Sequence, residues 1–398
     1  MPENKTLMPT AIDVDRGPDR VDAVLGIYVH IPFCQYRCTY CDFATYAGED
    51  AHMAGYVDCL LKEIDMRTPR NSTRFVTSVF FGGGTPSRLP IDSVARILGA
   101  IQARFRVAPN AEVTLEANPG TLDLGHMRAL RAAGVNRLSI GVQSLDDAIL
   151  KRVNRIHDAR QALETLERAR EAGFDSVSAD LIFGLPGQDR ANWEHTLRGV
   201  LAQEPDHLSV YGLILAPGTL LQHQVHSGSI VLPPDDDAAD MYDLAREVLA
   251  THGFVHYEIS NWARPGHRSR HNLLYWEHEA YLGVGLSAHS YLDGQRFGNV
   301  RGLQGYMRRL ETESLPTASS ESITADRARA DAIMLGLRLI RGIHLPSFDS
   351  RFGGSLLDSH RDTIERLGEL GLLEYVRQYL RLSEHGYLLA NQVWQQFI

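Results

Sequence analysis

Little cysteine, no long apolar run and no excess of positive charge characterise this sequence. Four of its 398 residues are cysteine, too few for the dispersed disulfide framework of a small secreted protein. No stretch approaches the roughly 18 consecutive apolar residues of a membrane-spanning helix, and the N-terminal residues lack the apolar region of a signal peptide. Forty basic and 49 acidic residues give a net charge of −9, which argues against a nucleic-acid partner because phosphate backbones are bound by basic surfaces. These absences predict a cytoplasmic protein.

The length and composition predict a globular chain with a large domain and a smaller one. Hydrophobic residues make up 44% of the chain and charged residues 22%, close to the average of globular proteins. After a polar leader at residues 1–22, apolar runs alternate with amphipathic helical patterns, which predicts a curved parallel sheet. We expect an α/β fold, a partial (β/α)6 barrel similar to a TIM barrel, over residues 23–235. The six expected strands lie at residues 23–31, 75–84, 111–119, 136–144, 175–186 and 206–217.

The pattern changes after residue 235. Residues 236–320 are expected to flank the barrel, with a helix followed by a strand at residues 254–260. Residues 321–398 are expected to form a small helical, winged-helix-like domain, in which two helices precede strand-like segments and a terminal helix. Because the net charge is negative, we expect this domain to cap the barrel rather than to bind DNA. Its strand-like segments lie at residues 372–376, 379–383 and 386–390.

Three of the four cysteines, Cys34, Cys38 and Cys41, form a CxxxCxxC motif directly after the first expected strand. Three thiolates on one loop can hold three irons of a cubane cluster and leave the fourth iron open. A zinc site and purely structural thiols remain as alternatives, although structural zinc prefers four ligands and only His30 is near enough in sequence to complete the set. Cys59 lies in a helical pattern, which favours a buried packing role over metal ligation.

The motif, with Tyr40 just before its third cysteine, resembles the signature of the radical S-adenosylmethionine superfamily. The resemblance implies a [4Fe-4S] cluster whose open iron binds S-adenosylmethionine. Other matching residues fall at the ends of successive expected strands. Carboxylates, an amide and a guanidinium suit a cation that carries ribose hydroxyls and a carboxylate. The positions that match the family's S-adenosylmethionine contacts are Tyr28, Gly82, Gly83, Gly84, Thr85, Glu116, Gln143, Arg155 and Asp180.

The segments YVHIPFC, GGGTP, EANP, GVQS and LIFGLPGQ closely resemble the oxygen-independent coproporphyrinogen III oxidase branch of the superfamily, and the likeness extends over the C-terminal module. The decarboxylating oxidases of this branch have a fourth cysteine two residues after the third, where this chain has Phe43, and a longer N-terminal extension. In both respects, the missing fourth cysteine and the short leader, the chain resembles the HemW heme chaperone subgroup. That subgroup keeps the cluster and the S-adenosylmethionine site but is regarded as lacking the oxidase reaction.

The hallmark of that subgroup is an HNxxYW motif, and this chain reads HNLLYW, with His271, Asn272, Tyr275 and Trp276 at the fixed positions. The resemblance implies that these residues bind heme, since an imidazole is a good axial ligand and aromatic rings offer flat faces to a porphyrin. On sequence grounds alone, a packed, hydrogen-bonded histidine is the alternative. If heme binds here, we expect the arginines that are close to the motif in sequence to meet its propionates; these are Arg264, Arg268 and Arg270.

The resemblance also implies partners. It predicts heme delivery to apo-hemoproteins of the respiratory chain, a homodimer that depends on the cluster, and peripheral association with the membrane. Two other radical enzymes remain as alternatives, a coproporphyrinogen III oxidase in porphyrin biosynthesis and an RNA-modifying enzyme. A zinc-stabilised α/β protein is a third alternative.

Overall fold

A twelve-stranded sheet forms the body of the protein in the computed structural model, which describes residues 24–68 and 74–397. The leader expected at residues 1–22 lies outside the described residues. All six expected strands are present, parallel and in sequence order, and a seventh parallel strand, β11, adds to the first one. The parallel strands, in spatial order, are β11 (Tyr281–Val284), β1 (Val24–Ile31), β4 (Phe75–Gly83), β5 (Arg106–Ala117), β6 (Arg137–Gln143), β7 (Ser176–Phe183) and β8 (His207–Gly212).

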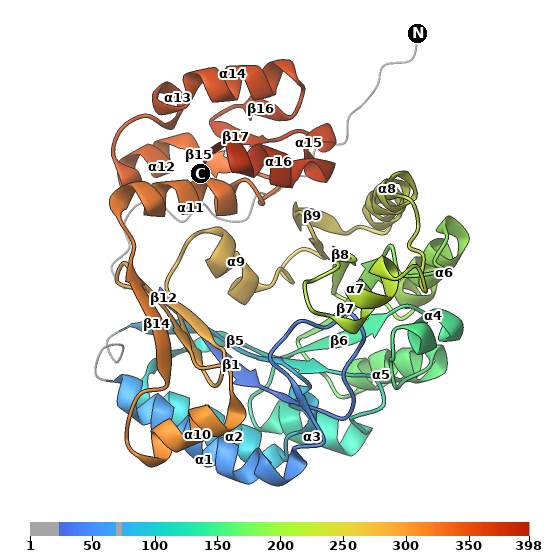
Figure 1. Ribbon diagram of the computed structural model, residues 1–398, viewed down its shortest axis with the longest axis vertical. Coiled ribbons are helices and arrows are strands. Elements are labelled where there is room, and N and C mark those ends of the chain that lie inside the picture. The colour runs from blue at the N-terminus through green and yellow to red at the C-terminus, as the bar shows by residue number, and fades with distance from the viewer. Residues whose placement is uncertain (1–23, 69–73, 398) are drawn as a thin grey trace.

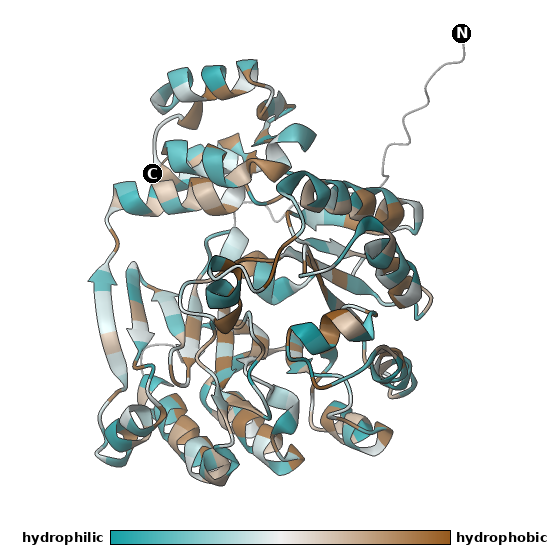
Figure 2. Ribbon diagram, turned by 45° about the vertical axis from the view of Figure 1, so that its right-hand side comes forward, coloured by the Kyte–Doolittle hydropathy of each residue, from teal (hydrophilic) through white to brown (hydrophobic). Residues whose placement is uncertain are grey.

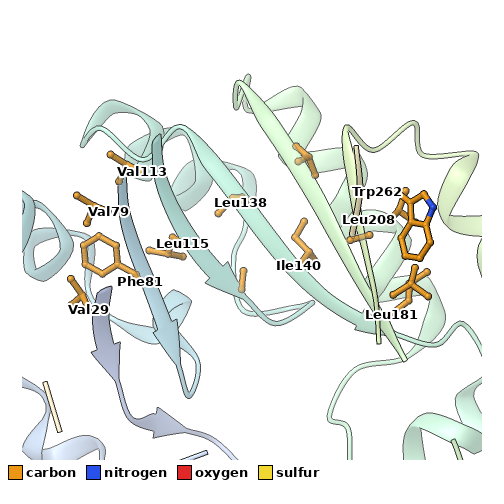
Figure 3. Close-up of a cluster of buried hydrophobic side chains, with 14 of the residues drawn as sticks. Val29, Val79, Phe81, Val113, Leu115, Leu138, Ile140, Leu181, Leu208 and Trp262 are labelled. Atoms are coloured by element: carbon orange, nitrogen blue, oxygen red, sulfur yellow. The ribbon is translucent and has the colours of Figure 1, made fainter. Parts of the chain in front are cut away.

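The sheet curves, and helices cover its convex face (Figure 1). Alternate strand residues such as Val29, Phe81 and Leu115 point into this layer and form the apolar core (Figure 3). The next residues along each strand point to the concave face, because strand side chains alternate. Asp158 and Asp189 each close a capping box at the start of a covering helix, which fixes where those helices begin. The helices that follow the parallel strands are α1 (Met53–Arg67), α2 (Ile91–Arg104), α3 (Leu124–Ala132), α4 (Asp147–Arg152), α5 (Ala159–Glu171), α6 (Arg190–Leu201), α7 (Leu220–His226) and α8 (Asp235–Thr251).

Antiparallel strands extend both ends of the parallel sheet. Beyond β8 lie β10 (Asn261–Ala263) and β9 (Val255–Glu258), the latter at the strand expected for residues 254–260. Beyond β11 lie β12 (His289–Leu292), β13 (Gln295–Asn299) and β14 (Thr317–Ser322), with α10 (Leu303–Glu311) packed outside. The edge strand β14 is hydrophilic and mostly exposed (Figure 2), which discourages pairing with another chain.

A small C-terminal unit sits over the concave side of the sheet (Figure 1). Two helices were expected ahead of its strands, whereas the structure has four, at Ala325–Gly336, Leu345–Phe352, Leu356–Ser359 and Arg361–Glu369. The strands expected near residues 373 and 380 are present. The strand expected at residues 386–390 is wrong, because the Ser383 hydroxyl accepts a hydrogen bond from the backbone of Gly386 and starts a helix there. The unit contains α11 (Ala325–Gly336), β15 (Ile343–His344), α12 (Leu345–Phe352), α13 (Leu356–Ser359), α14 (Arg361–Glu369), β16 (Leu373–Val376), β17 (Tyr379–Leu382), α15 (Glu384–Leu388) and α16 (Ala390–Trp394).

Within the described ranges, none of the helices has both the length and the apolar character needed to cross a membrane.

Candidate functional site

The cysteine loop leaves the carboxyl end of β1 and is held by a short parallel pair, β2 (Phe33–Cys34) with β3 (Tyr46–Ala47). Cys34 is buried, Cys38 and Cys41 are half-buried, and all three are free thiols. The backbone amide of Cys41 donates to the carbonyl of Cys38 at 3.2 Å, which tightens the loop. Burial raises the pKa of the Cys34 and Cys41 thiols, so a ligand that binds thiolates must supply compensating positive charge.

A chain of hydrogen bonds joins two of these cysteines. The Thr85 hydroxyl lies 3.5 Å from Sγ of Cys34 and accepts a hydrogen bond from Nδ2 of Asn118 at 3.0 Å. Oδ1 of Asn118 accepts from Nη2 of Arg155 at 2.8 Å, and Nη1 of Arg155 lies 3.5 Å from Sγ of Cys38. The Arg155 guanidinium therefore contacts the Cys38 thiol. Its orientation is set by Asn118, which is bonded in turn to the hydroxyl beside the Cys34 thiol.

The donors at this loop fit an iron–sulfur cluster held by three cysteines. Free thiols beside a guanidinium are suited to act as thiolate ligands. His30 is not free to complete a zinc set, because its Nδ1 lies 3.1 Å from the Tyr28 hydroxyl and its Nε2 lies 2.9 Å from the carbonyl of Ala44. Among the residues that the structure describes, no three His, Cys, Asp or Glu side chains converge on a position for a single metal ion.

The glycine turn after β4 packs directly against the cysteine loop. The amide of Gly84 donates to the carbonyl of Ile31 at 2.8 Å, and the amide of Thr85 donates to that of Phe33 at 2.9 Å. A Cβ at Gly84 would lie 2.8 Å from the backbone of Pro32, so only glycine permits this approach. Gly83 has a φ of +113°, and its amide is directed toward the concave face.

Two carboxylates meet on that face. Oε2 of Glu116 accepts the Gly83 amide at 3.1 Å, and the single proton of the Ser139 hydroxyl is shared by Oδ1 and Oδ2 of Asp180, at 3.0 and 2.9 Å. Burial and the charge of Asp180 raise the pKa of Glu116 to about 8, and burial raises the pKa of Asp180. Two acidic groups in one dry site favour a ligand that brings hydroxyls or positive charge.

Gln143 ends β6 in the left-handed conformation, with a φ of +66°. The β6–β7 register shifts between Gly141 and Gln143, which turns the end of the strand. A Cβ at Gly141 would lie 2.9 Å from Nε2 of Gln143 and 3.2 Å from Nη2 of Arg155, so this glycine leaves room for both side chains. The structure thus brings Tyr28, Gly83, Gly84, Thr85, Glu116, Gln143, Arg155 and Asp180 to the carboxyl edge of the strands beside the cysteine loop.

The HNxxYW motif forms a short helix, α9 (Arg270–Trp276), on the concave face (Figure 1). His271 is 1% exposed. Its Nδ1 lies 2.8 Å from the Ser78 hydroxyl, its Nε2 lies 2.8 Å from the Tyr275 hydroxyl, and its ring stacks on Phe80. Burial lowers the pKa of His271 to about 3, so the imidazole is neutral, and both of its nitrogens are occupied.

The other motif positions connect α9 to its surroundings. The amide of Asn272 is capped by the Ser269 hydroxyl at 3.3 Å. The Trp276 ring lies 4.3 Å below the guanidinium of Arg338, which also covers Trp394 of the C-terminal unit. The motif therefore contacts both the sheet and the C-terminal unit. The arginines expected near the propionates are engaged elsewhere: Arg264 with the Pro205 carbonyl, Arg268 over Tyr257 and Arg270 with the Asn110 carbonyl.

Comparisons with known proteins identify the family of this chain. A family model of the radical SAM superfamily matches residues 28–200, and a model of the HemN C-terminal domain matches residues 323–389. The heme chaperone HemW of Bacillus subtilis is 34% identical over 93% of this chain and 98% of its own length, and that of Escherichia coli is 34% identical over 94% and 98%. The chain belongs to the HemW family.

The fold of this HemW-family chain is also similar to a solved structure. Coproporphyrinogen III oxidase (HemN) from Escherichia coli, a radical SAM enzyme, superposes with a TM-score of 0.83 and 26% identity over 94% of this chain and 90% of the oxidase. The expected radical SAM fold with a C-terminal HemN domain is thereby confirmed. Phe43, two residues after Cys41, is 62% exposed in the HemW-family chain.

Sequence reasoning missed several residues of the site. Asn118 lies two residues after Glu116, and the alternation of strand side chains already indicated that both face the same side. Ser78 and Glu112 gave no such signal. Glu112 accepts the backbone amides of Arg270 and His271, both at 3.1 Å, and thereby fixes the start of α9.

Proposed function

We propose that this HemW-family protein binds a [4Fe-4S] cluster through Cys34, Cys38 and Cys41, binds S-adenosylmethionine beside it, and carries heme to apo-hemoproteins. The observation that carries the proposal is the hydrogen-bonded chain from Cys34 to Cys38, which lies at the strand edge where Glu116 and Asp180 meet. When bound, the cluster supplies an open iron for the amino and carboxylate groups of S-adenosylmethionine and an electron for its sulfonium.

In this proposal, each part of the site has its own task. The glycine turn at residues 82–85 allows the methionine amino group to approach the backbone closely. Glu116 accepts ribose hydroxyls, and the guanidinium of Arg155 pairs with the carboxylate, which is a charge-assisted contact. The remaining S-adenosylmethionine contacts assigned on the same grounds are Tyr28, Gln143 and Asp180.

The heme function rests on family membership, since the relatives carry the name heme chaperone. We assign His271, Asn272, Tyr275 and Trp276 to the heme-binding region. His271 itself can bind iron only after it releases Ser78 or Tyr275, because both nitrogens are hydrogen-bonded. The assignments of cytoplasmic location, respiratory apo-hemoproteins as partners, a homodimer and peripheral membrane association belong to the same proposal, as do the domain boundaries at residues 23–235, 236–320 and 321–398.

The cluster is tested on protein purified without oxygen. Iron and sulfide analysis should give about four of each per chain, and dithionite should produce the electron paramagnetic resonance signal of a reduced cluster. Addition of S-adenosylmethionine should change that signal. Zinc without sulfide would contradict the proposal. Heme delivery is measured as transfer from the loaded protein to an apo-hemoprotein.

A second candidate is coproporphyrinogen III oxidation, favoured by the structural similarity to HemN. It is tested by incubating the cluster-loaded protein with coproporphyrinogen III, S-adenosylmethionine and a reductant under argon. We expect no protoporphyrinogen, because a phenylalanine stands where the oxidases have a fourth cysteine. Product in stoichiometric amounts would replace the chaperone proposal.

A further inference from the structure

The cysteine loop packs against the end of α4. The backbone amide of Thr39 donates to the carbonyl of Val153 at 3.2 Å, and Nδ2 of Asn154 donates to the carbonyl of Arg37 at 2.7 Å. Because Arg37 and Thr39 flank Cys38, both bonds hold the loop beside this half-buried thiol. The loop and the end of α4 therefore form one continuous surface next to a proposed cluster ligand.

This surface is basic in an acidic chain. It consists of residues 35–41 and 148–157, which we call the loop–α4 surface, and these segments contain no aspartate or glutamate, although the whole chain has a net charge of −9. Arg155 is turned inward, with Nη1 3.5 Å from Sγ of Cys38. Three further cations are exposed, and none of them forms an ion pair in the part of the chain that the structure describes. They are Arg37, Lys151 and Arg152.

Two large apolar side chains stand among these cations. Tyr36 is 58% exposed and Ile156 is 41% exposed. Both line a small opening that Cys38 also lines. Exposed apolar side chains that are surrounded by polar ones favour protein contact, because contact removes their surface from water. The loop–α4 surface thus has the apolar centre and charged rim of a docking site.

The opening continues into a groove. The groove has a volume of about 770 Å³ and lies between the starts of α2 and α3. The opening is lined in addition by Thr85, Asn118 and Arg155, the three residues that link Cys34 to Cys38 by hydrogen bonds. A protein that docks on the loop–α4 surface can therefore place a protruding edge against the side chains that contact the thiols. The opening and the groove share Gln35, Arg88, Thr121 and Ile156.

The carboxylates near this region do not cancel its charge. Asp50 is paired with Arg88 at 2.5 Å. Asp92 lines the groove at the start of α2 but does not line the opening. The exposed Asp42 follows the loop directly, so one carboxylate borders a surface with three exposed cations. The surface therefore favours a partner with a carboxylate-rich face.

We propose that the loop–α4 surface is the docking site of an acidic one-electron carrier protein that reduces the cluster; this rests on the proposed function. In that function each electron passed to the sulfonium must be replaced by a donor. The docked carrier loses one electron and the cluster gains it, while no bond forms or breaks and no proton moves. Complementary charge steers such a partner to its site and speeds association. Electron-transfer encounters use small interfaces, so two short segments and the adjoining groove are enough.

The inference is tested on the full, cluster-loaded chain with a reduced plant-type [2Fe-2S] ferredoxin, an acidic carrier with a potential of about −400 mV. Lys151→Glu reverses one exposed charge at the end of α4. Stopped-flow absorbance should give a second-order rate constant at least about fivefold lower than that of wild type at low ionic strength. The difference should shrink in about 0.5 M salt, because salt screens exposed charges. Binding of oxidised ferredoxin, measured by isothermal titration calorimetry, should weaken by a similar factor.

Two controls separate docking from damage to the cluster. Lys62→Glu makes the same change at an exposed position of α1, in the outer helix layer, and should react with ferredoxin like wild type. Reduced methyl viologen is a small cation and should reduce Lys151→Glu at least as fast as wild type, because the charge that repels it has been reversed. Slower reduction of this variant by both donors would overturn the inference, since the substitution would then act on the cluster itself.

The remaining outcomes distinguish this inference from the function on which it rests. Wild-type ferredoxin kinetics and affinity in Lys151→Glu, or an equal loss in Lys62→Glu, would overturn the docking site while the cluster stands. Loss of a dimer in Lys151→Glu with unchanged reduction by ferredoxin, seen by analytical ultracentrifugation, would assign the surface to a second copy of the chain instead. Wild-type protein that holds no iron and sulfide would overturn the proposed function itself.

Discussion

Nη2 of Arg155 donates a 2.8 Å hydrogen bond to Oδ1 of Asn118, and this contact joins two cysteines of one loop through the end of β5. Neither residue is near the loop in sequence. The same guanidinium also donates to the carbonyl of Gly141 at 2.5 Å, so residues at the ends of β5 and β6 fix its orientation beside the cysteine loop. The electrostatic environment of the Cys38 thiol therefore depends on an amide that does not touch it.

Asn118→Ala should disconnect Thr85 from Arg155. The loss of two hydrogen bonds at a half-buried site should lower the free energy of unfolding by about 1–3 kcal/mol. It should also shift the reduction potential of the cluster, because hydrogen bonds near the sulfurs tune it. Redox titration followed by electron paramagnetic resonance measures the shift. Asn110→Ala, at an exposed position of the same strand, is the control. Equal potentials in the two variants would exclude a positioning role for Asn118.

The cysteines should divide into two classes. Cys38→Ala should abolish iron and sulfide binding, because the cluster loses one of three ligands. Cys59→Ala should retain full iron content, since Cys59 is buried in α1 and its thiol lies 3.9 Å from the carbonyl of Met307. Cys59→Ala should lower only the free energy of unfolding, by about 1 kcal/mol, because it removes part of a small buried side chain. Iron loss in Cys59→Ala would contradict the three-cysteine assignment.

Glu116 should make the stability of the ligand-free protein depend on pH. Its pKa is raised from 4.5 to about 8, so the folded protein keeps a proton in this range that the unfolded chain has released. Stability therefore falls as the pH rises from about 4.5 to about 8. Glu116→Gln carries no charge at any pH and should flatten this part of the urea-unfolding profile. Glu171→Gln, a surface ion-pair partner that is 56% exposed, should leave it unchanged. Parallel profiles for all three proteins would refute the raised pKa.

Arg338 should be a principal contact between the C-terminal unit and α9. It bonds to the fully buried Glu258 at 3.2 Å and covers Trp276 and Trp394. Arg338→Ala leaves that carboxylate without its cation and should cost about 3–5 kcal/mol in urea unfolding. Arg341→Ala is the control, because the ion pair that it breaks with Glu277 is 53% and 29% exposed and should cost at most about 1 kcal/mol. Similar losses of stability in the two variants would argue against Arg338 as a principal contact between the C-terminal unit and α9.

The parallel sheet could be predicted from sequence because each of its first six strands is a buried apolar run followed by polar residues. β11 to β13 could not, because these strands are short and carry glycine and polar residues such as Gly283, His289 and Arg296. Their conformation depends on pairing within the sheet, β11 with β1, β12 with β11 and β13 with β12, which only the tertiary structure supplies. The helix at Gly386 was missed for a local reason, since its apolar residues resemble a strand and the cap at Ser383 outweighs them.

The candidate site divides in the same way. Cys34, Cys38 and Cys41 were predictable because their spacing lies within one loop. The partners of His271 were not, because Ser78 is 193 residues away and nothing in the motif indicates that the imidazole is already bonded. Asn118 could have been predicted, because strand side chains alternate and Asn118 lies two residues after Glu116.

The pairing of β1 with β11 determines the order in which the two proposed sites are completed during synthesis. Residues of the cysteine loop and its hydrogen-bonded chain leave the ribosome early, since Arg155 is the last of them. β11, which pairs with β1 on the edge opposite β4 (Ile27 with Leu282), is translated only in the third quarter of the chain. A nascent chain stalled between these points would leave one edge of β1 uncovered, and that edge would be exposed to chaperones or to other chains.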